Sequence, residues 1–265
     1  LYHLTEEPQY AHKAAVILDR VADVYPDMDF MPLHKQGFEH SHGGPGRGRI
    51  LGSIWETSMA NTMSSSYDKI FDGPKDNDEL VKFCSEKAKQ YKLRDKSSIE
   101  AICTHIEDHL VMEILISCTD GRISPNIGGT HVSVIYAAVA LDRPEVTDEW
   151  LDYIFDANFP GDYTKSKFPL QWIMIQGIDR DGMGGENGGY GLGWTRRAQQ
   201  FPDLLAMYPD YKGHDLVAEY PKLRQCFFIE PRLMVLNAAF PNIGDSGAAG
   251  TGGRLGNAAT FATGY

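Results

Sequence analysis

Apolar residues recur at steps of three and four along most of this chain, a spacing that places them on one face of an α-helix. The first run extends from Pro8, a residue typical of a first helical turn, to Pro26, which ends it. The same spacing predicts further helices over 50–71, 80–91, 97–115, 131–141, 149–155, 195–207 and 231–239. The chain is therefore expected to fold mainly as helices.

Polar residues at the starts of these runs predict the helix caps. Asp76 or Asp78 can cap the run over 80–91, and Ser97 with Glu100 forms a capping box. Thr147 can cap the run over 149–155. Strand signals are weak, and two segments have enough bulky apolar residues to compete as strands, 170–178 and 226–229, of which the first fits a helix equally well.

Successive helices separated by loops predict an all-α fold of antiparallel helical hairpins. The helices are too many for a four-helix bundle, and the chain lacks the internal repeat of a regular solenoid. A ring or partial barrel of hairpins fits better. Loops at one end of such a ring would converge over its mouth and line a cleft there.

Composition and charge narrow the function classes. The chain has 265 residues, of which 42% are hydrophobic, and its formal net charge is −11. Nucleic acid is not expected as a partner, because phosphate binding needs a concentrated basic surface. A membrane span is not expected either, because no apolar run approaches about 18 residues. The start at Leu1, without a methionine or a signal segment, suggests a mature form or an internal fragment.

Long loops rich in glycine and polar residues are the candidate functional segments, because loops of this length in a compact domain are usually functional or disordered. These segments are 36–49, 124–130, 179–194 and 241–257. The third, DRDGMGGENGGYGLGW, frames Tyr190 between glycines. Glycine permits close approaches that other residues forbid, so the Tyr190 hydroxyl is the first candidate for chemistry; a tyrosine packed in a turn is the alternative.

Five segments in this order resemble the heparinase II/III-like polysaccharide lyases. They are YAHKAAVILDRVADVYP (10–26), GRGRILGSIWE (46–56), AAVALDRPEVTDEW (137–150), DRDGMGGENGGY (179–190) and PNIGDSG (241–247). The resemblance implies an incomplete α/α toroid with long glycine-rich loops, as one domain over 1–265, in a fragment of a longer chain whose β-sandwich domains are missing. It also implies a secreted or periplasmic enzyme.

The resemblance further implies β-elimination in a uronate-containing acidic polysaccharide. This reaction needs a group that neutralises the carboxylate, a base for the adjacent proton, and an acid for the leaving oxygen. Tyr190 matches the catalytic tyrosine of the family. Either Asn126 or His131 matches a second position, as a carboxylate donor or as a base. A further histidine that the family's β portion supplies has no counterpart here.

Other residues are candidates for substrate binding. Glu186 can steer Tyr190, Trp55 and Glu56 can line a sugar subsite, and Arg47 and Arg49 can join His40 and His42 in a local positive patch. The plainer alternatives are solvated loops for the charged residues and a core position for Trp55.

Two other function classes fit the same fold. A non-catalytic carbohydrate-binding or assembly protein would keep the toroid without the chemistry. A glycoside hydrolase would need two carboxylates facing one cleft, for which Glu56, Asp181 and Glu186 are available. No cofactor or metal is expected, because Asp179, Asp181 and Glu186 lack the spacing of an EF-hand calcium loop and no nucleotide-binding motif is present.

Overall fold

A computed structural model describes residues 1–34, 48–75, 77–160, 167–186 and 188–234. Across these ranges the regular structure is helical without any strand, and Ile178 and Gly184 form an isolated bridge. The all-α prediction is confirmed for this part of the chain. The described residues divide into two compact units, one up to Leu151 together with Pro160, the other Asp152–Phe159 and from Lys167 onward.

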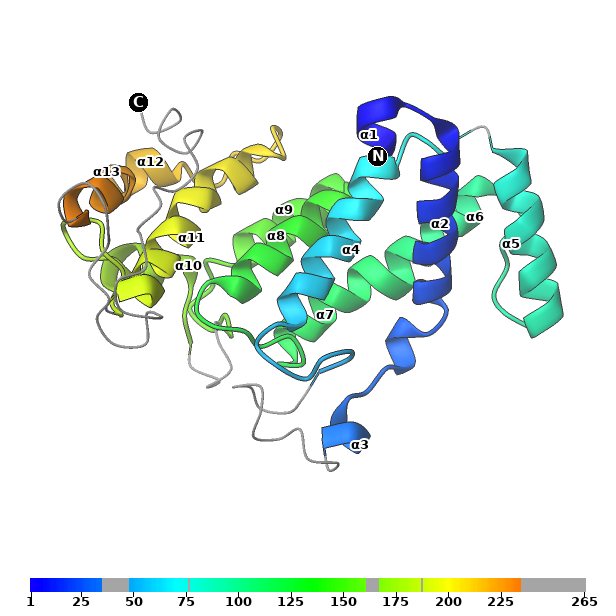
Figure 1. The fold of residues 1–265 in the computed structure, drawn as a ribbon, viewed down its shortest axis with the longest axis horizontal. Helices are drawn as coiled ribbons and strands as arrows, with labels where there is room; N and C mark the ends of the chain where they lie inside the picture. The colour runs from blue at the N-terminus through cyan, green and yellow to red at the C-terminus, as the bar shows by residue number, and fades with distance from the viewer. Residues whose placement is uncertain (35–47, 76, 161–166, 187, 235–265) are drawn as a thin grey trace. The chain divides into compact units, whose positions relative to one another are not determined.

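The first unit contains most of the helices (Figure 1). They are α1 (Tyr2–Thr5), α2 (Pro8–Ala22), η1 (Tyr25–Asp27), α3 (Met31–His34), α4 (Glu56–Ile70), α5 (Asp78–Tyr91), α6 (Ile99–Ile106), η2 (Glu107–Val111), α7 (Met112–Thr119), α8 (Gly129–Leu141) and α9 (Pro144–Tyr153), whose last two residues belong to the second unit.

Helix α8 forms the centre of the first unit. Its sequence, GTHVSVIYAAVAL, is apolar around the whole helix, and every residue except Tyr136 is buried. It packs against α4 and α7, as Figure 1 shows. The Ser133 hydroxyl on α8 donates to Asn61 Oδ1 on α4 at 2.7 Å, and Gly129 faces Thr57 one turn earlier on both helices. Helices α4 and α8 therefore run parallel and begin at the same end.

Helix α7 runs antiparallel to α8. The segment just before α7, at Glu107 and Asp108, lies at the end of α8, because Arg143 pairs with these two residues at 2.5 and 3.1 Å. The end of α7 lies near the start of α8, because it leads directly into the loop before α8. Segments α6, η2 and α7 form one continuous helical stretch from Ile99 to Thr119, in which η2 has π geometry. A π segment inside an α-helix marks one residue more than the α repeat accommodates.

The second unit is built around α11 (Gly188–Ala206), with α10 (Leu170–Trp172), the π segment η3 (Ile173–Gly177), α12 (Leu216–Glu219) and α13 (Leu223–Leu233). Helix α11 packs against η3, α12 and α13. The Gln199 amide on α11 donates to the Cys226 carbonyl on α13 at 2.7 Å, and Phe201 is fully buried. These contacts fix the helix that carries Tyr190.

The predicted helices are largely confirmed, with shifts in their starts. Helix α4 begins at Glu56 rather than at 50, since the preceding residues form a loop around the Glu56 carboxylate. Helix α11 begins at Gly188 rather than at 195, so Tyr190 lies in its first turn and not in a loop. Helix α9 begins at Pro144 and ends at Tyr153, earlier than predicted at both ends.

The predicted caps are wrong by one residue in two cases. Asn77, not Asp76 or Asp78, caps α5 by accepting from Leu80 N at 2.9 Å. Ser98, not Ser97, caps α6 by accepting from Ala101 N at 3.1 Å. Thr147 lies inside α9, where its hydroxyl donates to the Ala138 carbonyl at 2.9 Å and ties α9 to α8.

Both segments that competed as strands are helical. Residues 170–177 form α10 and η3. The strand over 226–229 is wrong, because these residues lie within α13, which buries Cys226 and Ile229 on one helical face. The helix predicted over 231–239 overlaps the end of α13, and its residues after 234 lie outside the described part. Two predictions depend on how the two units assemble: that the hairpins form a ring, and that residues 1–265 form a single domain. Both stay predictions.

Candidate functional site

Tyr190 lies on the second unit with its side chain 46% exposed. It occupies the first turn of α11, where Gly188 has a φ of 62°. Glu186, just before this turn, is exposed as well. The phenol is therefore accessible to a ligand, as the sequence prediction requires.

The glycines around Tyr190 serve close backbone contacts. A Cβ on Gly191 would lie 1.8 Å from the Glu186 carbonyl oxygen. Gly182 has a φ of 93°, and a Cβ there would meet the backbone of Gln225 on α13 at 2.4 Å. Only glycine fits either position. The segment before Tyr190 is consequently packed onto its own helix and onto α13.

Thr195, on α11, holds residues 182–184 by hydrogen bonds. Its buried hydroxyl donates to the Gly182 carbonyl at 2.8 Å and accepts from Gly184 N at 3.1 Å. The backbone is also closed by a bond from Asp179 N to the Met183 carbonyl at 2.8 Å. Residues 179–186 are therefore tied by their backbone to the start of α11 and to α13.

Asn126 and His131 lie on the first unit, at the start of α8. Asn126 is half-buried in the loop, and its carbonyl accepts from Gly129 N at 3.0 Å. His131 has no exposed surface. A fully buried imidazole does not reach a polymer in solvent, so of the two alternatives the geometry favours Asn126 as the residue that contacts a ligand.

Trp55 lies near the same end of the first unit. It directly precedes α4 and is 62% exposed, so it is not a core residue. A Cβ on Gly129 would lie 3.7 Å from the Thr57 methyl group, which places the start of α8 beside the first turn of α4. The structure thus brings Trp55 and the Asn126 loop to one end of two parallel helices.

Glu56 is buried and engaged by its own loop. Its Oε1 accepts from Arg49 N at 3.2 Å and Ile50 N at 2.9 Å, and its Oε2 accepts from Leu51 N at 2.6 Å and Gly52 N at 3.0 Å. Four backbone donors occupy the carboxylate, and only 1% of the residue is exposed. As placed, Glu56 shapes the loop before α4 and does not present its carboxylate to a sugar.

Arg49 is also committed to the interior. Its guanidinium donates to Ser117 Oγ at 2.6 Å and to the carbonyls of Tyr25 at 2.8 Å and Pro26 at 2.6 Å, and it pairs with Glu113. The side chain has no exposed surface. It joins η1 and α7 to the loop before α4. The other members of the predicted positive patch, Arg47, His40 and His42, lie outside the described residues.

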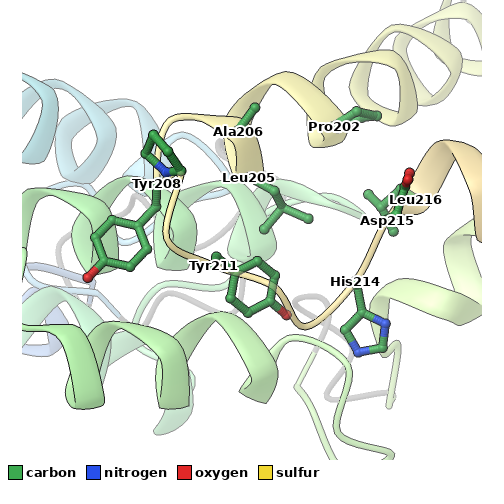
Figure 2. A pocket seen from close by; sticks show the side chains of 9 residues that line it. Pro202, Leu205, Ala206, Tyr208, Tyr211, His214, Asp215 and Leu216 are labelled. Atoms are coloured by element: carbon green, nitrogen blue, oxygen red, sulfur yellow. The ribbon is translucent and has the colours of Figure 1, made fainter.

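A pocket of about 380 Å³ lies on the second unit, after the end of α11 (Figure 2). Its lining includes Tyr208, Tyr211 and His214, which come from the segment between α11 and α12. The Tyr211 hydroxyl donates to Asp152 Oδ1 at 2.8 Å. The His214 ring stacks on Phe155 with a centroid distance of 3.7 Å, and its Nδ1 lies 3.0 Å from Glu219 Oε2. Aromatic walls with a few polar atoms are typical of small-molecule sites.

This pocket was missed by sequence reasoning. Its signal in the sequence is the density of aromatic residues and histidine in YPDYKGH (208–214), a segment with a single glycine. Pro202, at its edge, lies 12 residues after Tyr190 on α11, or about 18 Å along the helix axis. The pocket and Tyr190 therefore sit at different ends of one helix.

Two structural tests bear on metals and membranes. Within the described ranges, no group of three or more His, Cys, Asp or Glu side chains is placed to hold a metal ion. Within the same ranges, no helix has both the length and the apolar character needed to cross a bilayer. Comparison with protein-family models, curated proteins and solved structures found no match to this chain.

Proposed function

We propose that this chain is a secreted or periplasmic polysaccharide lyase that cleaves a uronate-containing acidic polysaccharide by β-elimination. One observation carries the proposal: the Tyr190 phenol is exposed on a segment whose backbone is fixed by close glycine packing and by Thr195. A proton-transfer residue has to be accessible and held in position, and Tyr190 satisfies both requirements.

Each step of the elimination has a candidate residue. Tyr190 protonates the leaving glycosidic oxygen and, as its phenolate, takes the proton next to the carboxylate. Asn126, on the first unit, donates to a uronate carboxylate from the N-terminal end of α8, where the positive end of the helix dipole favours an anion. Exposed Trp55 offers an apolar ring to a neighbouring sugar. Under the proposal, the carboxylate contact belongs to Asn126 and not to buried His131.

The incomplete α/α toroid is part of the same proposal. Its support is the order of directions within the first unit, where α4 and α8 run parallel and α7 runs against them. Successive hairpins in a ring produce this alternation. Regular solenoids produce it as well, so the ring itself rests on the family resemblance.

A non-catalytic carbohydrate-binding protein on the same fold is the second candidate. The burial of His131 favours it, since it removes one of the two residues that the resemblance assigns to the chemistry. Under this alternative, Trp55 and the pocket at Tyr208 and Tyr211 bind sugar without cleavage.

The decisive experiment follows ultraviolet absorbance during incubation with heparan sulfate, alginate and other uronate polymers. A lyase leaves an unsaturated product that absorbs, and Tyr190→Phe should abolish the signal while Tyr220→Phe, on the same unit, leaves it unchanged. Asn126→Ala should slow the reaction by about a hundredfold or more, the usual effect of losing one donor to developing charge.

Three outcomes would replace the proposal. New reducing ends without absorbance would indicate a hydrolase. Binding to the polymers without either product would indicate the carbohydrate-binding protein. Full activity in Tyr190→Phe would remove Tyr190 from the mechanism, even if the enzyme is a lyase.

A further inference from the structure

A second pocket, of about 640 Å³, lies on the first unit between α2 and α5. Its size falls within the range of roughly 300 to 1,000 Å³ typical of small-molecule sites. Nothing in the proposed mechanism uses it. All its lining residues belong to α2 and its C-cap Asp23, to α5 and to the segment after α5, so the pocket is complete within one unit.

The floor of the pocket is a buried cluster of charges. Lys96 is 2% exposed and donates to Asp19 Oδ2 at 2.6 Å and to Asp23 Oδ1 at 2.8 Å. The Asp23 carboxylate also hydrogen-bonds to His105 Nε2 at 3.1 Å and to the Arg20 guanidinium at 3.2 Å. Paired charges of this kind are the form in which ionic groups tolerate burial.

Asp19 is the exception within this cluster. It is 4% exposed, and its Oδ1 is buried without a hydrogen-bond partner. The Cys84 thiol hydrogen-bonds to the Asp19 side chain but is a weak donor, and burial raises its pKa to about 12. Burial raises the pKa of the Asp19 carboxyl as well. A buried acceptor left unsatisfied costs free energy, so a hydroxyl donor brought by a ligand would relieve it.

The wall formed by α5 has a different character. Phe83, Lys87 and Tyr91 follow each other at four-residue steps and form one stripe of the helix. The Lys87 ammonium lies 5.6 Å from the Phe83 ring centre and 6.0 Å from that of Tyr91. Tyr91 is 61% exposed. The wall therefore offers an aromatic surface with a cation on it.

Positive charge also lies on the opposite wall. The Arg20 side chain on α2 is 62% exposed and pairs with Asp23 through one nitrogen. Together with Lys87 it makes the rim of the pocket positive in a protein whose net charge is −11. An anionic ligand group is attracted to such a rim. The negative charge of the Asp19 carboxylate repels the same group from the floor of the pocket.

We infer that this pocket binds a small hydroxylated carboxylate. A ligand hydroxyl donates to the Asp19 carboxylate, which lines the pocket, the ligand carboxylate lies at Lys87 and Arg20, and an apolar ring face packs on Tyr91. A uronic acid has all three features, and its choice as the natural ligand rests on the proposed function. The site is distinct from Tyr190, which lies on the other unit.

The inference is tested by titrating the full chain with three probes and following backbone amide shifts in an NMR spectrum. Glucuronate should shift amides of α2 and α5. Glucose lacks the carboxylate, and cyclohexanecarboxylate lacks the hydroxyls, so each should bind at least about fivefold more weakly. Shifts confined to residues outside α2, α5 and 92–96, or no shifts at all, would overturn the inference.

Surface variants assign the contacts. Lys87→Gln should weaken glucuronate about fivefold and leave glucose unchanged, while Lys82→Gln, exposed on the same helix and outside the pocket, serves as the control. Tyr91→Ala should weaken both sugars. Equal glucuronate affinity in all three variants would overturn the inference. The absorbance assay with Tyr190→Phe reports on the lyase alone, so either proposal can fail without the other.

Discussion

At the scale of single residues, Glu56 shows how one carboxylate sets the start of a helix. A glutamate at the first position of α4 also favours the helix electrostatically. Its four backbone contacts, however, reach back over the loop from Arg49 to Gly52. The Arg49 side chain donates to Ser117 and to the Tyr25 carbonyl, so Glu56 and Arg49 both hold this loop in place.

We expect Glu56→Ala to lower the free energy of unfolding by about 3 kcal/mol, because it leaves buried backbone donors unsatisfied. Glu56→Gln keeps one carbonyl oxygen and should lose less. Urea denaturation measures both. Glu149→Ala, at an exposed position of α9, is the control and should stay within about 0.5 kcal/mol of the original protein.

A second residue-scale prediction concerns pH. Burial, with Lys96 nearby, lowers the pKa of His105 below its ordinary value. On acidification the unfolded chain therefore takes up this proton first, and the folded state loses stability as pH falls through about 6.5. His105→Gln removes the proton uptake and should reduce the loss of stability between pH 8 and pH 5.5.

The same denaturation series on His3→Gln, whose side chain is exposed, is the control and should follow the original pH dependence. An unchanged pH dependence in His105→Gln would show that its burial does not perturb its protonation. Asp19 acts in the opposite direction, since its raised pKa makes the folded state take up a proton first.

At the scale of elements, two of the four glycines in α11 have opposite environments. Gly191 is buried against the Glu186 carbonyl, whereas a Cβ on Gly193 would meet nothing within 4 Å. Gly193→Ala should raise the free energy of unfolding by about 0.5 to 1 kcal/mol, because alanine favours the helix.

Gly191→Ala should lower the free energy of unfolding by about 2 kcal/mol or more, because the new methyl group meets a backbone atom that has no room to move. Thermal denaturation of the pair measures both effects. If the two variants have the same stability, the close packing before Tyr190 is absent. Under the proposed function, Gly191→Ala also slows cleavage, since it displaces Tyr190.

Helices with periodic apolar faces were predictable from sequence. The runs predicted over 8–26 and 80–91 have such faces, and they correspond to α2 (Pro8–Ala22) and α5 (Asp78–Tyr91). The strand over 226–229 was wrong, because four bulky residues fit either period and the helix is fixed by contacts with Gln199, distant in sequence. The start of α11 was missed because glycines disfavour helices locally and only tight packing compensates.

At the scale of the whole molecule, α8 organises the first unit. Twelve of its thirteen residues are buried, and α4 and α7 pack on it. A fragment of residues 1–153 should therefore fold, with helical circular dichroism and a cooperative urea transition. A fragment of residues 1–128, without α8, should show no cooperative transition. The same transition in both would contradict the central role of α8.

The candidate sites were less predictable than the fold. Tyr190 could be found because its glycine-rich neighbourhood is continuous in sequence. Asp19 could not, since its burial depends on Lys96, 77 residues later. In sequence, Asp19 and Arg20 look like an ordinary solvated helix face. The pocket at Tyr208 likewise needs Asp152 and Phe155, which precede it by more than 50 residues.

The π segment η2 sets the rotation of the helix before it relative to the helix after it. It accommodates one residue beyond the α repeat within a continuous helical stretch. Removing one residue from Glu107–Val111 would restore that helix and turn the part before it by about 100° relative to α7. His105 would then leave Asp23, and Ile106 would leave the core. The charged floor of the α2 and α5 pocket thus depends on the extra residue that η2 accommodates.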